Sequence, residues 1–168
     1  EKWIMANKGR LNRYCSIVEK QVARFKSKYK PGQVMIIFAY SVEMCNIFAN
    51  RLKESFPDYR ISSFTADTEE EVLFNNDIII STILSAGTGK DIPNLTINFM
   101  TTAIDSKQAN EQVLGRTRKL VNYPGQYPEF IYLTCSGIQS HMNYHENKLK
   151  DFRDKCRTHN LDYAGVLV

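Results

Sequence analysis

Val34-Met35-Ile36-Ile37-Phe38 is a continuous apolar run, rich in branched and aromatic side chains. Such a run is typical of a strand that is covered on both faces, as in a parallel sheet. Further strands are expected at Tyr59–Phe64, Ile78–Ile80, Leu95–Met100 and Phe130–Thr134.

Helices are expected between these strands. One helix over roughly 8–29 has a single apolar stripe, formed by Leu11, Tyr14, Cys15, Val18, Val22 and Phe25. Ser41 can cap a second helix that runs to about Phe56, and Asp105 or Ser106 can cap a third. A long polar helix is expected from about Ile138 to Cys156. Strands that alternate with helices predict an α/β fold, as a single domain with a mostly parallel sheet and helices on both faces.

The composition is that of one ordinary globular domain. The chain has 168 residues, of which 43% are hydrophobic and 24% charged. No apolar run approaches the roughly 20 residues that a membrane span needs, and no signal peptide is evident. The four cysteines are scattered, which favours reduced thiols. We therefore expect an intracellular protein, in the cytoplasm or nucleus, without a membrane partner. Because the chain opens at Glu1 without a methionine, we also expect a fragment of a longer protein.

Positive charge is concentrated at the beginning of the chain. Residues 1–30 hold nine Lys and Arg against two acids, a balance of +7 in a chain whose net charge is +4. Residues 1–30 are thus expected to form a basic linker helix that packs on a domain spanning 31–168. The basic surface is either a solvated helix face or a surface that lies near nucleic-acid phosphates.

Two polar segments carry the candidate chemistry. Gln112-Val113-Leu114-Gly115-Arg116-Thr117-Arg118-Lys119 places three cations and a glycine at the end of one expected helix. Arg116 and Arg118 offer planar forks that fit phosphate oxygens, although such clusters also occur as solvated helix caps. Ser81-Thr82-Ile83-Leu84-Ser85-Ala86-Gly87-Thr88-Gly89-Lys90-Asp91-Ile92-Pro93 supplies hydroxyls and glycines.

In a parallel sheet, ligands gather beyond the carboxyl ends of the strands. We therefore expect both polar segments to open on that edge, together with Tyr40–Ser41 and Thr101–Thr102.

Gly87-Thr88-Gly89-Lys90 is not the end of a phosphate-binding P-loop. That motif needs another glycine at position 84, where this chain has Leu84, and a Ser or Thr after the lysine, where it has Asp91. Pro93 also prevents a helix from starting there. The chain therefore contains no P-loop at this position.

The order of the motifs resembles the C-terminal RecA-like domain of superfamily 2 helicases over nearly the full chain. The segment 36–41 resembles motif IV, Ser81-Thr82 with residues 89–93 resembles motif V, and 112–116 resembles motif VI. The loop Ser85-Ala86-Gly87-Thr88-Gly89 is similar to that of the UvsW group of phage and large-DNA-virus helicases. This likeness implies a DNA substrate in preference to RNA and, for a viral protein, a location in the host cell.

The resemblance implies a nucleotide site shared by two RecA-like domains. The N-terminal domain of the same protein would supply the P-loop and bind most of the ATP and Mg2+, and no metal ligand is expected here. Arg116 matches an arginine finger that stabilises charge on the transferred phosphoryl group. Gln112 matches a residue that couples the nucleotide to the interface, and Gly89 and Asp91 match positions near the nucleotide sugar. The isolated chain is therefore expected to be inactive.

The resemblance also implies contacts to a nucleic acid. Ser41 and Thr82 match positions that touch its backbone. Tyr40, at the end of the motif IV strand, can reach a nucleotide, although most aromatic residues belong to the core or its rim.

The chain departs from motif VI at the second arginine finger. Lys119 occupies the usual arginine position, and Arg118 lies one residue early. Either Lys119 serves as a point charge, or the end of the helix shifts to present Arg118. We favour Arg118.

Two other interpretations remain. The chain could be a non-catalytic α/β module that binds nucleic acid or a protein through its basic N-terminal helix, but such a module does not need Gln112 and Arg116 at this spacing. His141 and His145, four residues apart, resemble metal ligands only weakly, because no third ligand stands at a suitable spacing. A surface pair is the simpler interpretation.

Overall fold

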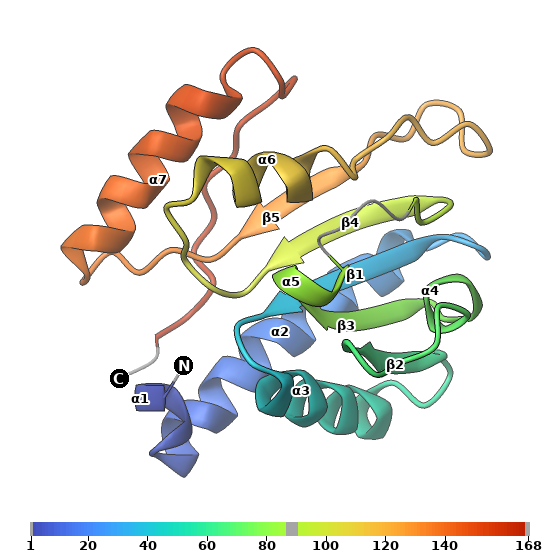
Figure 1. Cartoon of the computed structure of the whole chain (residues 1–168), viewed down its shortest axis with the longest axis horizontal. Coiled ribbons are helices and arrows are strands. Elements are labelled where there is room, and N and C mark those ends of the chain that lie inside the picture. Colours follow the sequence, from blue (N-terminus) through green and yellow to red (C-terminus); the bar gives the residue numbers. More distant parts are fainter. Residues whose placement is uncertain (1, 87–90, 167–168) are drawn as a thin grey trace.

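The computed structural model describes residues 2–86 and 91–166. These residues form a five-stranded sheet in the order β2-β3-β1-β4-β5, and every neighbouring pair is parallel (Figure 1). The strands are β1 (Val34–Ala39), β2 (Ile61–Phe64), β3 (Ile78–Thr82), β4 (Leu95–Met100) and β5 (Glu129–Tyr132). The predicted parallel α/β sheet is therefore confirmed.

The helices cover both faces of this sheet, as predicted (Figure 1). They are α1 (Lys2–Met5), α2 (Lys8–Lys28), α3 (Val42–Ser55), α4 (Val72–Asn75), α5 (Ile83–Ala86), α6 (Lys107–Leu114) and α7 (Gln139–Phe152). The short helices α1, α4 and α5 were not predicted, because a single turn leaves no apolar periodicity in the sequence. No described helix is long and apolar enough to cross a membrane.

Strand β1 shows how the two sides of the core are divided. Met35 and Ile37 belong to the apolar cluster beneath α2 and α3, whereas Ile36 and Phe38 belong to the cluster on the opposite face. Because successive side chains of a strand point to opposite faces, a strand buried on both faces must be apolar throughout. Burial of each such side chain contributes about 1.5–3 kcal/mol.

Serine caps fix the starts of α3 and α6. The Oγ atom of Ser41 accepts a hydrogen bond from the Met44 backbone N–H at 3.2 Å. The Ser106 Oγ atom accepts one from Ala109 at the same distance, so Ser106 and not Asp105 is the cap of α6. Each cap satisfies a backbone donor that the helix itself leaves unpaired.

Helix α2 runs across the sheet in the direction opposite to the strands. Near its beginning, the Tyr14 hydroxyl donates to the Thr101 carbonyl oxygen at 2.6 Å, just beyond the carboxyl end of β4. Near its end, Arg24 pairs with Glu129, the first residue of β5, at 2.8 Å. Its apolar stripe forms part of the main core. The beginning of α2 therefore lies at the carboxyl edge of the sheet.

Candidate nucleotide and nucleic-acid interface

The two polar segments that sequence analysis singled out meet in space. The Nε atom of Arg118 lies 3.2 Å from the Oδ1 atom of Asp91. Beside this ion pair, the Asn122 side chain donates to the Oδ1 atom of Asn94 at 3.1 Å. The residues that match motifs V and VI are therefore adjacent.

Their meeting point differs from the expected position at the carboxyl edge of the sheet. Asp91 and Asn94 lead into β4, and the Asn94 carbonyl oxygen accepts a hydrogen bond from Val34, the first residue of β1. The physical reason is the direction of α6, which follows β4 and runs back along the sheet (Figure 1). Arg116 and Arg118 follow the end of α6 and so lie toward the amino ends of the strands. Among the described residues of these segments, Tyr40–Ser41, Thr82, Ser85 and Thr101–Thr102 lie at the carboxyl edge, as expected.

An open groove of about 290 Å³ surrounds the ion pair. It is lined by Asp91, Ile92, Pro93, Asn94, Leu95, Arg116, Arg118, Lys119, Leu120, Val121 and Asn122. Its volume is at the lower limit for a small-molecule site, so it could cover only part of a nucleotide. A second surface would have to complete the site.

The cations of this groove differ in their surroundings. Arg116 is half-buried, whereas Arg118 and Lys119 are exposed. Burial lowers the pKa of the Arg116 guanidinium, and the negative charge of Asp91 partly offsets this effect. Gln112 lies on the exposed side of α6. Gly89, the other residue expected near the nucleotide, lies outside the described residues.

The groove fits an anion better than a metal ion. Arg116, Arg118 and Lys119 suit phosphate oxygens, while Asp91, its acidic residue, already pairs with Arg118. Among the described residues, no three His, Cys, Asp or Glu side chains gather as metal ligands. The groove can therefore bind phosphate, but a Mg2+ ion would need ligands from elsewhere.

The carboxyl edge carries hydroxyl groups. Thr82 Oγ1 donates to the Ser85 Oγ atom at 2.9 Å and accepts from the Ser85 backbone N–H at 3.1 Å. Thr82 pairs with Ala39 in the sheet, which places it beside Tyr40 and Ser41. Tyr40 is 70% exposed. The expected backbone-contacting residues therefore lie together, apart from the arginine groove.

The basic residues at the end of α2 are paired with acids of the same chain. Arg24 and Lys28 lie 2.8 and 3.5 Å from Glu129, and Lys26 lies 3.5 Å from Asp58. These pairs are exposed and contribute at most about 1 kcal/mol each. The end of the basic helix is therefore partly neutralised by its neighbours, with two acids facing three cations.

Helix α7 contains a buried cation that the sequence did not indicate. Lys148 is 3% exposed, and its ammonium group donates to the Ile104 carbonyl oxygen at 2.5 Å, with the Tyr132 ring centroid 5.3 Å away. Burial lowers the pKa of Lys148. A lysine in a polar helix normally reaches solvent, so nothing in the sequence indicated that Lys148 would be buried. In the structure, Lys148 holds the loop before α6 through the Ile104 carbonyl.

Of the two histidines of α7, His145 has a side-chain hydrogen-bond partner, whereas the buried Nδ1 atom of His141 has none among the described residues. The Nδ1 atom of His145 lies 2.8 Å from the Tyr132 hydroxyl, and the His141 backbone carbonyl accepts a hydrogen bond from Thr134 at 3.1 Å. His145 thus supports the packing of α7 on β5.

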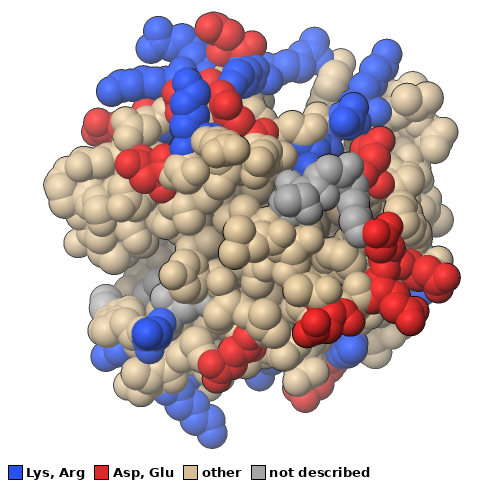
Figure 2. Space-filling model, viewed as in Figure 1, with Lys and Arg blue, Asp and Glu red and all other residues tan. Residues whose placement is uncertain are grey.

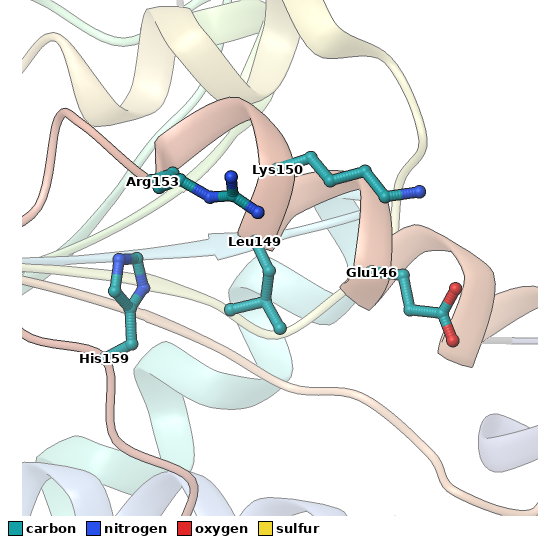
Figure 3. A pocket seen from close by; sticks show the side chains of 5 residues that line it. All are labelled: Glu146, Leu149, Lys150, Arg153 and His159. Carbon is teal, nitrogen blue, oxygen red and sulfur yellow. The ribbon is translucent and has the colours of Figure 1, made fainter.

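A larger groove of about 480 Å³ lies between α7 and the segment that follows it. Its lining residues are Glu146, Leu149, Lys150, Arg153 and His159, none of which was predicted as a site residue. Figure 3 shows the polar ends of Glu146 and Lys150 extending away from Leu149. This groove does not bring polar groups together, and we assign it no function.

Comparison with solved structures identifies the fold. Domain 2 of the DEAD-box helicase Mss116p, solved bound to an RNA duplex, matches 87% of this chain and 56% of its own, with a TM-score of 0.62 and 18% identity. The chain has a RecA-like fold. The C-terminal domain of the DEAD-box protein Dbp5 matches 80% of this chain and 78% of its own, with a TM-score of 0.57 and 15% identity. The Hef helicase domain of Pyrococcus furiosus matches 83% of this chain and 28% of its own, with a TM-score of 0.53 and 18% identity.

Sequence comparison gives one curated relative, the transcript termination protein A18 of fowlpox virus. It is 30% identical over 112 residues, which cover 63% of this chain. The chain spans about a quarter of the length of that relative, since the match covers 24% of it. No family model matches the chain.

Proposed function

We propose that this chain is the second motor domain of an ATP-dependent superfamily 2 helicase or translocase. The observation that carries the proposal is the Arg118–Asp91 ion pair, which brings the segments resembling motifs V and VI into one groove with Arg116. The RecA-like fold supports it.

In this proposal the groove is one half of a nucleotide site. Arg116 acts as an arginine finger on the transferred phosphoryl group, and Arg118 or Lys119 supplies a second cation. Asp91 and Gly89 lie near the nucleotide sugar, and Gln112 couples the nucleotide to the domain interface. A first RecA-like domain supplies the P-loop and the ligands of Mg2+.

The hydroxyl groups at the carboxyl edge hold the nucleic acid in this proposal. Ser41 and Thr82 bind the phosphate backbone, and Tyr40 lies close enough to contact a nucleotide. The loop beginning at Ser85 supports the UvsW group and DNA, whereas the Mss116p domain was solved with RNA. Titration with DNA and RNA strands of matched sequence decides between the two. The fowlpox relative supports a viral protein that acts inside the host cell.

Magnesium-dependent ATP turnover tests the proposal. The chain alone should show no turnover above buffer, while a protein that joins it to its P-loop domain should hydrolyse ATP when nucleic acid is added. ATP turnover that purifies with the isolated chain would contradict the proposal that the groove is only one half of a nucleotide site. A joined protein that binds nucleic acid without any turnover indicates a non-catalytic binding module.

A further inference from the structure

We propose that the N-terminal end of the chain forms a second contact for a single nucleic-acid strand, with Trp3 stacking on a base and Lys8 and Arg13 binding phosphates. This inference rests on the proposed function, since it extends the path of the strand from Ser41 and Thr82. It concerns α1 and the first turns of α2, and not the ion-paired end of that helix.

Helices α2 and α3 pack beside each other. The ring centroids of Tyr14 and Phe48 are 5.4 Å apart, and the Nε atom of Arg51 lies 2.9 Å from a carboxylate oxygen of Glu19. The two helices therefore run side by side in the same direction (Figure 1). With this register, Lys8 lies level with the beginning of α3.

This register makes the N-terminal end continuous with the carboxyl-edge hydroxyls. Ser41 is the N-cap of α3, and Tyr14 bonds to Thr101 on the same edge. A strand held at Ser41 therefore needs only a short extension to reach Lys8.

Three cations of α1 and the first turns of α2 are available to an external anion. Lys2, Lys8 and Arg13 are exposed, and none of them forms an ion pair within the part of the chain that the structure describes. Arg24 and Lys28, at the other end of α2, both pair with Glu129. Figure 2 shows a group of acidic residues on the side of α4. The unneutralised charge therefore favours a polyanion at the start of α2.

Trp3 is held in a position that suits base stacking. Its neighbours Ile4 and Met5 pack against the core, whereas Trp3 itself is 52% exposed. The guanidinium carbon of Arg10 lies 3.8 Å from the centroid of the Trp3 ring, and Arg10 Nη1 donates to the Trp3 carbonyl oxygen at 2.9 Å. An ordered aromatic ring beside cations is the arrangement that binds single strands without sequence preference.

Tryptophan fluorescence tests this inference directly, because Trp3 is the only tryptophan of the chain. The 168-residue chain is titrated at low salt with oligo-dT and with oligo-U, while the anisotropy of a labelled strand reports binding independently. Stacking should quench the Trp3 emission in parallel with binding. Trp3→Ala should weaken binding at least about fivefold. Unchanged Trp3 emission at saturation, or no binding at low salt, overturns the inference.

Salt dependence tests the phosphate contacts. Lys8→Ala with Arg13→Ala should reduce the slope of log K against log salt by about 1.4, since each phosphate contact on a single strand contributes about 0.7. The matched control, Lys150→Ala with Arg153→Ala, removes two exposed cations at the end of α7 and should leave the slope unchanged. Equal slopes in both double variants contradict the inference.

Two further outcomes separate this inference from the proposed function. If Ser41→Asp weakens binding but Lys8→Ala with Arg13→Ala does not, the inference fails and the strand contacts at the carboxyl edge stand. If polyglutamate quenches the Trp3 emission as strongly as the oligonucleotides do, the surface binds an acidic protein. This outcome also overturns the inference.

Discussion

The Nε atom of Arg118 lies 3.2 Å from the Oδ1 atom of Asp91, and this ion pair connects the segment that enters β4 to the segment that leaves α6. Both side chains are 71% exposed, so solvent screens the pair and its contribution to stability is at most about 1 kcal/mol. A phosphate group could therefore displace Asp91 from Arg118 at little cost. The ion pair thus holds the Arg118 guanidinium beside the groove, although the stability of the fold does not depend on it.

The identity of the second cation can be tested in the protein that contains both motor domains. We expect Arg118→Ala to lower the nucleic-acid-stimulated kcat more than Lys119→Ala, because only the guanidinium offers a planar fork to phosphate. Steady-state ATP turnover measures both, with Arg153→Ala as the control. A larger effect of Lys119→Ala assigns the role to Lys119. If neither change exceeds about threefold, the groove uses Arg116 without a second cation from this chain.

The two roles proposed for Ser41 can be separated by substitution. Ser41→Ala removes the cap of α3 and should lower the free energy of unfolding by about 0.5–2 kcal/mol, whereas Ser41→Asp keeps a capping oxygen and should be nearly neutral. Single-strand binding should fall in both variants, and further in Ser41→Asp, because the new carboxylate repels phosphate. Urea unfolding and anisotropy titration measure the two effects. Equal binding by all three proteins removes Ser41 from the strand path.

Much of the fold could be predicted because the central strands have a local signature. Continuous apolar runs marked β1 and β3, and Ser41 and the pair Asp105–Ser106 marked the beginnings of two helices. The position of Arg116 could not be predicted in the same way. It depends on where α6 ends and on the direction in which α6 crosses the sheet, and both are set by packing between segments distant in the sequence.

The candidate site shows the same division. The sequence predicted that Asp91, Arg116 and Arg118 belong to one site, and the structure places all three around one groove, although at the amino end of β4. The burial of Lys148 left no signal, because its carbonyl partner Ile104 lies 44 positions away. The exposure of Trp3 depends likewise on how α1 turns at the edge of the core.

Acid should weaken the hydrogen bonds that Asp77 accepts from Arg60 and Tyr29 at the amino edge of the sheet. Asp77 accepts hydrogen bonds from the Arg60 backbone and guanidinium at 3.0, 3.1 and 2.9 Å and from the Tyr29 hydroxyl at 3.0 Å. Burial alone would raise the pKa of Asp77, but these hydrogen bonds outweigh it and hold the pKa below the ordinary value of 3.8. Because the folded pKa is the lower one, the carboxylate contributes stability above pH 3.8 that is lost as the pH falls through the folded pKa.

Asp77→Asn isolates this contribution. At neutral pH the variant should be less stable than the natural protein by about 1–3 kcal/mol, and the difference should shrink below about pH 4. Urea unfolding across a pH series measures it. A difference that stays constant through the acid range contradicts the assignment to Asp77.

A buried amide in β4 offers a test of the core. Asn98 is fully buried, and within the described part of the chain neither its Oδ1 nor its Nδ2 atom has a hydrogen-bond partner. A buried amide without partners costs about 1–3 kcal/mol, so Asn98→Leu should raise the free energy of unfolding by a similar amount. Urea unfolding at neutral pH measures this. A loss of stability instead would show that the amide is satisfied by a bound water or ligand.

The substitution Arg116→Ala, in the protein that joins this chain to its P-loop domain, tests the account most directly. Steady-state ATP turnover at saturating nucleic acid should show kcat lowered at least about 100-fold and KM for ATP changed by no more than about threefold, because an arginine finger acts mainly in the transition state. Arg116→Lys keeps the charge but loses the planar fork, so its kcat should lie between that of the unsubstituted protein and that of Arg116→Ala. An unchanged kcat in Arg116→Ala, with strand binding intact, would contradict the proposal that this chain is the motor domain that supplies the arginine finger.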